Sequence, residues 1–106
     1  MKIAIPQFKE RISPHFGASG KILLIDIEGE TVRRETILDV GDKSAMEIAR
    51  LLVELGVEKV ICGGIQYYYK EWLISKGICV MYNQKGEAGE TIRMILEKEA
   101  FTNKND

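Results

Sequence analysis

The sequence predicts an α/β protein with one five-stranded mixed sheet and three helices. The first third of the chain contains two β-rich runs joined by a turn, which indicates a hairpin. The rest alternates short apolar strands with amphipathic segments that end at glycines. Hairpin strands pair antiparallel, whereas strands separated by helices imply parallel crossovers. At 106 residues the chain has the size of a single domain.

Three strands are expected before the first helix. The first is the apolar run 2–5, and Pro6 is expected to end it because proline donates no ladder hydrogen bond. Residues 7–19 contain two breakers and are predicted to form a long loop. The runs 21–27 and 31–38 are rich in apolar and β-branched side chains, so we expect them to pair across a short turn.

Three helices alternate with the two remaining strands. Ser44 and Glu47 have the spacing of a capping box, which predicts a helix that starts there and ends near Gly56. The following elements are expected to be a strand at 57–62, a helix at 65–76, a strand at 78–82 and a helix at 88–100. Residues 102–106 are polar and are expected to fray, so the domain is assigned to residues 1–101.

The aromatic run in the second helix allows two interpretations. Helical spacing favours a buried face, and the alternative is that the aromatic rings roof a pocket. The residues expected on the buried face are Ile65, Tyr68, Tyr69, Trp72 and Leu73.

The crossover rule fixes the predicted order of the strands. Right-handed crossovers place the fourth strand beside the first and the fifth outside it, which gives the sheet order 3-2-1-4-5. This is a ribonuclease H-like arrangement. A small flavodoxin-like sheet is the alternative, but it lacks the early hairpin.

Composition and charge narrow the function classes. The formal net charge is −1 and the charges are interleaved, which argues against nucleic acid as a partner. No apolar run approaches the roughly 20 residues of a membrane helix, and the N-terminus does not resemble a signal peptide, so we expect a cytoplasmic protein. Two cysteines and one histidine cannot form a closed zinc site, and the cytosol favours free thiols.

Candidate ligands follow the carboxyl ends of the first and fourth strands, where ligands bind in open α/β sheets. His15 lies in the loop after the first strand, and Cys62 ends the fourth, so we expect them to converge. A cysteine before a helix is expected to have a lowered pKa, and a thiolate and an imidazole suit iron-containing clusters. By contrast, Cys79 opens the fifth strand at the opposite pole and is expected to be a buried structural residue.

Backbone and basic groups complete this candidate site. Gly63 and Gly64 would allow a ligand to approach the backbone, and their amides could donate to an anion. Lys9 and Arg11 would help to hold an anionic cluster. Each feature also has a structural interpretation, because a loop histidine, a core cysteine and a Gly-Gly turn are common without any ligand.

Three sequence features together resemble one known family. They are the opening residues 1–6, the Ser13-x-His15-Phe16-Gly17 loop and the turn Cys62-Gly63-Gly64-Ile65. In these features the chain resembles the dinitrogenase iron–molybdenum cofactor biosynthesis family, which includes NifX-like proteins and the C-terminal domain of NifB-like proteins. The resemblance covers residues 1 to about 96. The resemblance implies a ribonuclease H-like fold that binds or carries a metal–sulfur cluster, without catalysis. The cargo would be iron–molybdenum cofactor, a precursor or an iron–sulfur cluster, and the partners would be cluster donors or acceptors.

Two other function classes stay open, and one is excluded. Cys62 and His15 could form a nucleophile–base pair of a small enzyme. The candidates to orient the imidazole, Asp39 and Asp42, are weak because they follow the third strand, at the other edge of the sheet. The domain could also be an interaction module whose Cys-Gly-Gly turn is structural. A two-metal nuclease is rejected, because the first strand carries no carboxylate.

Overall fold

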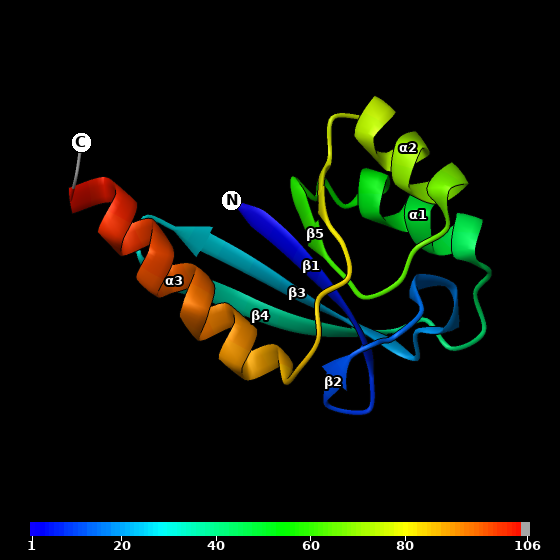
Figure 1. Cartoon of the computed structure of the whole chain (residues 1–106), viewed down its shortest axis with the longest axis horizontal. Coiled ribbons are helices and arrows are strands. Elements are labelled where there is room, and N and C mark those ends of the chain that lie inside the picture. Colours follow the sequence, from blue (N-terminus) through cyan, green and yellow to red (C-terminus); the bar gives the residue numbers. More distant parts are fainter. Residues whose placement is uncertain (105–106) are drawn as a thin grey trace.

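The computed structural model describes the backbone of residues 1–104 and the side chains of residues 1–97. Figure 1 shows the elements in chain order. They are β1 (Lys2–Phe8), β2 (Arg11–Ile12), the 3₁₀ turn η1 (Phe16–Ala18), β3 (Lys21–Glu28), β4 (Thr31–Asp39), α1 (Ala45–Glu54), β5 (Lys59–Ile61), α2 (Tyr67–Ser75), β6 (Cys79–Met81) and α3 (Ala88–Lys104). Within the described part of the chain, every helix is too short or too polar to cross a membrane.

The sheet is mixed and has the order β4-β3-β1-β5-β6, with β2 paired to one end of β1. The first three strands of that order are antiparallel, and β1, β5 and β6 are parallel. The predicted mixed α/β architecture, strand order and three α-helices are therefore confirmed. The predicted number of strands is wrong, because the sheet has six strands rather than five. The ribonuclease H-like assignment stays a prediction.

The extra strand arises because β1 continues through Pro6 to Phe8, so the prediction that Pro6 ends the strand is wrong. Pro6 is in register with Ile22 of β3, and its carbonyl accepts a hydrogen bond from the Ser13 amide on the other side (2.9 Å). The N–H and C=O of a strand residue point to the same edge, so the donor that Pro6 lacks would face β5. Parallel pairing with β5 stops at Ala4. Proline thus limits only the parallel ladder.

Helices cover both faces of the sheet (Figure 1): α1 and α2 lie on one face and α3 on the other. The α1–α2 side holds one apolar cluster, whose most buried members include Ala4, Phe16, Ile22, Ile48, Leu52, Val60, Cys62 and Leu73. The α3 side holds a second cluster, which includes Ile3, Ile5, Ile12, Leu23, Ile25, Ile61, Ala88 and Ile92. The capping box of Ser44 and Glu47 is present at the start of α1, as predicted.

Two helix assignments differ from the expected ones. Tyr68 is 63 % exposed, whereas its helical position predicted burial, and Leu73 is the buried residue of α2. The last helix, α3, continues to Lys104, so the predicted frayed segment 102–106 begins within it. Residues 105–106 lie outside the described residues.

The loop after β2 packs directly on the turn after β5. The Gly64 amide donates to the Pro14 carbonyl and the Phe16 amide donates to the Gly64 carbonyl, each at 2.8 Å. A Cβ atom on Gly63 would lie 2.3 Å from the carbonyl oxygen of Ser13. Only glycine fits at this contact, because real Cβ atoms do not approach backbone so closely.

We therefore expect Gly63→Ala to lower the free energy of unfolding by about 3 kcal/mol, the upper part of the range for overpacked sites. Urea denaturation measures this change. The matched control is Gly89→Ala in α3, where an added Cβ meets no atom within 4 Å. The control should be about 1 kcal/mol more stable than the wild type, since alanine favours helix. Equal stability of the two variants would contradict the contact.

Candidate functional site

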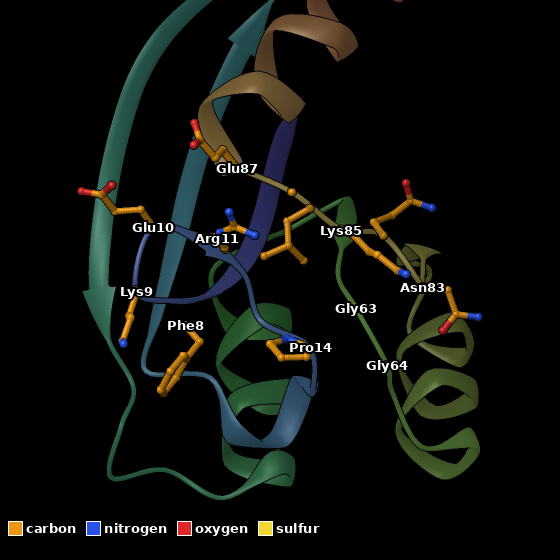
Figure 2. A pocket seen from close by; sticks show the side chains of 13 residues that line it. Phe8, Lys9, Glu10, Arg11, Pro14, Gly63, Gly64, Asn83, Lys85 and Glu87 are labelled. Atoms are coloured by element: carbon orange, nitrogen blue, oxygen red, sulfur yellow. The ribbon is translucent and has the colours of Figure 1, made fainter.

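A cavity of about 1030 Å³ lies at the carboxyl edge of the parallel strands. Figure 2 shows the three segments that border it: the turn between β1 and β2, the Gly63–Gly64 turn, and residues 83–87 before α3. Each segment follows the end of a strand, and those strands are neighbours in the sheet. This is the edge at which open α/β sheets bind ligands.

Four of the predicted site residues line this cavity: Lys9, Arg11, Gly63 and Gly64. Lys85 also lines it, although it is not among the predicted site residues. A signal was available, because Lys85 follows the carboxyl end of the fifth predicted strand, just as the other segments follow the first and fourth. The three segments are linked by backbone hydrogen bonds from Ile12 to Gly86 and from Asn83 to Gly63, both 2.9 Å.

The charges of the cavity favour an anion. Lys9, Arg11 and Lys85 carry three positive charges, and Glu10 and Glu87 carry two negative ones. Among the described side chains, none of the three cations forms a salt bridge; the ion pairs present lie elsewhere. Cations without a partner can be neutralised by a bound anion that contacts them directly.

Unusual backbone conformations also gather at this cavity. Lys9 (φ 60°) and Asn83 (φ 58°) are the non-glycine residues with left-handed φ in the described chain, and both line the cavity. Gly86, at φ 113°, lines it as well. For lysine this conformation is strained, and such strain is concentrated at functional sites.

His15 lies beside Gly64 but in a different cavity. Its side chain is exposed and, with Gln66 and Tyr69, lines a hollow of about 460 Å³ between η1 and the starts of α1 and α2. The ring nitrogen Nδ1 would be 3.7 Å from a Cβ on Gly64. Gly64 lines both cavities, so the structure brings His15 to the predicted turn while separating it from Lys9 and Arg11.

Cys62 differs from its predicted state. The side chain is fully buried in the α1–α2 cluster, and burial raises the pKa of the Cys62 thiol to about 12. The expectation of a lowered pKa is therefore wrong. Two physical reasons explain it: the apolar surroundings disfavour a thiolate, and α2 begins only at Tyr67, so its positive end is not next to the sulfur. A ligand or nucleophile role for Cys62 would require the core to open.

The backbone of the Gly-Gly turn is also largely engaged. The Gly64 amide is bonded to Pro14, and the space at Gly63 is filled by Ser13 and Pro14. The expectation that both amides are free for a ligand is wrong for Gly64. The glycines serve close packing of the loop as well as bordering the cavity.

Cys79 is exposed, so the prediction that it is buried is wrong. It opens β6, the edge strand, and has a paired strand on one side only, where it is in register with Lys59 of β5. Both cysteines are free thiols, as predicted. Within the described residues, no group of three or more His, Cys, Asp or Glu side chains is placed to hold a metal ion.

The fold and this site define a small α/β domain with a cation-lined cavity at the carboxyl edge of its sheet. The sequence profile described as dinitrogenase iron-molybdenum cofactor matches residues 1–98, and the chain belongs to this family. The predicted family membership is confirmed.

Relatives cover most of the chain. An uncharacterized protein of Methanocaldococcus jannaschii, MJ0580, is 28 % identical over 102 residues, which cover 92 % of this chain and 86 % of that protein. The crystal structure of PH0822 is similar with a TM-score of 0.86 and 27 % identity, covering 92 % of this chain and 90 % of that one. The apo form of the orange protein from Desulfovibrio gigas has the same fold, with a TM-score of 0.76, 18 % identity, and coverage of 92 % and 88 %.

Thiol labelling should separate the two cysteines. At pH 8 an aromatic disulfide reagent is expected to modify Cys79 rapidly, because its side chain is exposed. Cys62 should react only after urea unfolds the domain, since it is buried and its pKa is about 12. Cys79→Ser is the control and should remove the fast phase. Fast labelling that survives in this variant would contradict the buried position of Cys62.

Lys9→Gly is expected to raise the free energy of unfolding by about 1 kcal/mol, because glycine accepts a φ of 60° without strain. Urea denaturation measures the change. Lys9→Ala removes the same charge and keeps the strained conformation, so it should show no such gain. Equal gains in both variants would mean that charge, and not backbone strain, is relieved.

Proposed function

We propose that this protein binds an anionic metal–sulfur cluster, of the iron–molybdenum cofactor type or a precursor, and carries it between proteins that supply and receive it. The family description supports the type of cargo. The observation that carries the proposal is the cavity at the carboxyl edge, lined by three cations without salt-bridge partners among the described residues.

The residues present fit a cluster that is held by charge rather than by a cysteine bond. Arg11 and Lys85 donate charge-assisted hydrogen bonds to sulfide or oxygen on the cluster surface, and Lys9 adds positive charge at the turn. Gly63 and Gly64 border the cavity with backbone only, because the space where their side chains would lie is taken by the loop residues Ser13, Pro14 and His15. The buried thiol of Cys62 takes no part, because it is protonated and enclosed in the core.

His15 has a separate place in the proposal. His15 is the single histidine of the sequence. Its exposed imidazole lies beside Gly64, on the side away from the cation-lined cavity. A neutral imidazole can ligate a metal at the border of a cluster that extends past the Gly64 turn. The protein would then supply one direct ligand and several ionic contacts, which suits reversible carriage. Binding and release need no bond change at a thiolate and no catalytic step.

An interaction module without cargo is the second candidate. The engaged backbone at Gly63 and Gly64 favours it, since this turn has a packing reason that needs no ligand. The small Cys62/His15 enzyme is not favoured, because a thiol with a pKa of about 12 is a poor nucleophile at neutral pH.

Tetrathiomolybdate tests the proposal as a stable, anionic metal–sulfur probe. Anaerobic equilibrium dialysis followed by visible absorption should show saturable binding that weakens as salt is added, because exposed charges are screened. Arg11→Ala and Lys85→Ala should each raise Kd by about threefold to fivefold. His15→Ala should give a change of similar or smaller size.

Lys76→Ala is the control, because Lys76 lies after the end of α2, away from the cavity, and should leave Kd unchanged. Wild-type affinity in the Arg11→Ala/Lys85→Ala double variant would refute the charged cavity as the site. Complete loss in His15→Ala alone would move the site to the cavity of His15.

A further inference from the structure

Exposed aromatic rings stand on both sides of the charged cavity. Phe8 is 52 % exposed and lines the cavity, while Tyr82, 45 % exposed, directly precedes the lining residue Asn83. Tyr67, at 72 % exposure, starts α2 just after the Gly63–Gly64 turn. Large apolar rings so exposed beside a cavity are typical of interaction surfaces.

Lysine ammonium groups lie over the faces of these rings. Lys9 Nζ is 5.8 Å from the ring centre of Phe8. Lys70 Nζ lies between two rings, 5.3 Å from the centre of Tyr67 and 4.5 Å from that of Tyr82. Neither lysine forms a salt bridge with a side chain in the described region. We call these five residues, Phe8, Lys9, Tyr67, Lys70 and Tyr82, the aromatic–lysine rim.

We propose that the aromatic–lysine rim is a docking surface for a partner protein that presents acidic side chains. The rings hold the ammonium groups in place by cation–π attraction, so two positive charges are ordered without being neutralised. Carboxylates on a partner would form ion pairs with these two ammonium groups and speed association. The rings would supply the apolar area of a binding hot spot. The docking surface depends on the proposed function in one respect only: the partner would dock in order to exchange the cluster over the cavity.

Charge and geometry disfavour the other occupants. A single-stranded nucleic acid stacks its bases on open aromatic faces, whereas Lys70 occupies faces of both Tyr67 and Tyr82. The net charge of −1 gives no general attraction to phosphate backbones. A symmetric contact between the rims of two copies would bring lysines against lysines, since none of the five rim residues carries a carboxylate. An acidic protein surface is the partner that matches the rim.

The test uses the whole chain and a dye-labelled peptide of alternating Asp and Glu with one central Leu, compared with its Asn/Gln counterpart. At low salt, fluorescence anisotropy should show at least fivefold tighter binding of the acidic peptide. Lys70→Ala is expected to weaken that binding by about threefold to fivefold, and Tyr82→Ala should do the same.

The matched control is Lys76→Ala. Lys76 also has its ammonium over an aromatic ring, 5.3 Å from the centre of Trp72, but at the other end of α2. This variant should bind the acidic peptide as the wild type does. Equal loss in Lys70→Ala and Lys76→Ala, equal binding of the Asn/Gln peptide, or tighter binding of a poly-dT oligonucleotide would each overturn the proposal.

The outcomes also separate docking from cargo binding. Lys70 does not line the cavity, so Lys70→Ala should leave the tetrathiomolybdate Kd unchanged while it weakens the acidic peptide. Specific peptide binding without tetrathiomolybdate binding would refute the cluster proposal and leave the docking surface standing. Tetrathiomolybdate binding without peptide specificity would refute the docking surface alone.

Discussion

The contact between the loop after β2 and the turn after β5 determines how the carboxyl edge of this sheet is arranged. Two backbone hydrogen bonds join Gly64 to Pro14 and Phe16, and the missing side chain of Gly63 leaves room for the Ser13 carbonyl. A side chain at Gly63 would prevent this packing, and the two hydrogen bonds hold the loop against the turn. Its position then separates the cavity of His15 from the cavity of Lys9, Arg11 and Lys85, which share Gly64 as a border. One steric constraint thus gives the domain two neighbouring cavities with different chemistry.

Desolvation explains why the thiol in the core is neutral while the groups at the edge of the sheet are charged. Cys62 sits at the strand end where a reactive group was expected, but the surrounding apolar side chains keep its thiol neutral. The groups that remain available at the edge are cations on flexible stems and bare backbone, which bind by charge and shape. A site of this kind accepts an anion without a covalent bond, and its affinity depends on ionic strength more than on the protonation of a cysteine.

The sequence alone predicted the parts of the fold that depend on hydrophobic periodicity and turn chemistry. The hairpin of β3 and β4 and the capped start of α1 follow from local signals, and the general rule for parallel crossovers then gives the observed strand order. Two failures concern tertiary context. Pro6 is predicted to end β1, but the strand continues because the N–H that proline lacks would face the β5 side, where parallel pairing has already stopped at Ala4. The burial of each cysteine depends on the face of the sheet that its side chain occupies. Cys62 packs in the α1–α2 cluster, whereas Cys79 shares a face with Met81 of the α3-side cluster, at the start of the edge strand. Lys9 and Arg11 can be predicted because they follow the first strand. Lys85 can be predicted in the same way only when the segment after β6 is also treated as part of this edge of the sheet.

The exposed thiol of Cys79 gives this domain a natural point of attachment. It opens β6, and the cavity begins with Asn83, beyond the other end of that strand. Four residues of extended chain span roughly 13 Å, so a fluorophore, a spin label or a solid support joined to this sulfur would leave the carboxyl edge free. The buried thiol of Cys62 does not compete for such reagents in the folded state. The sequence as it stands can therefore be tethered through a single point away from its cavity, with no engineered residue required.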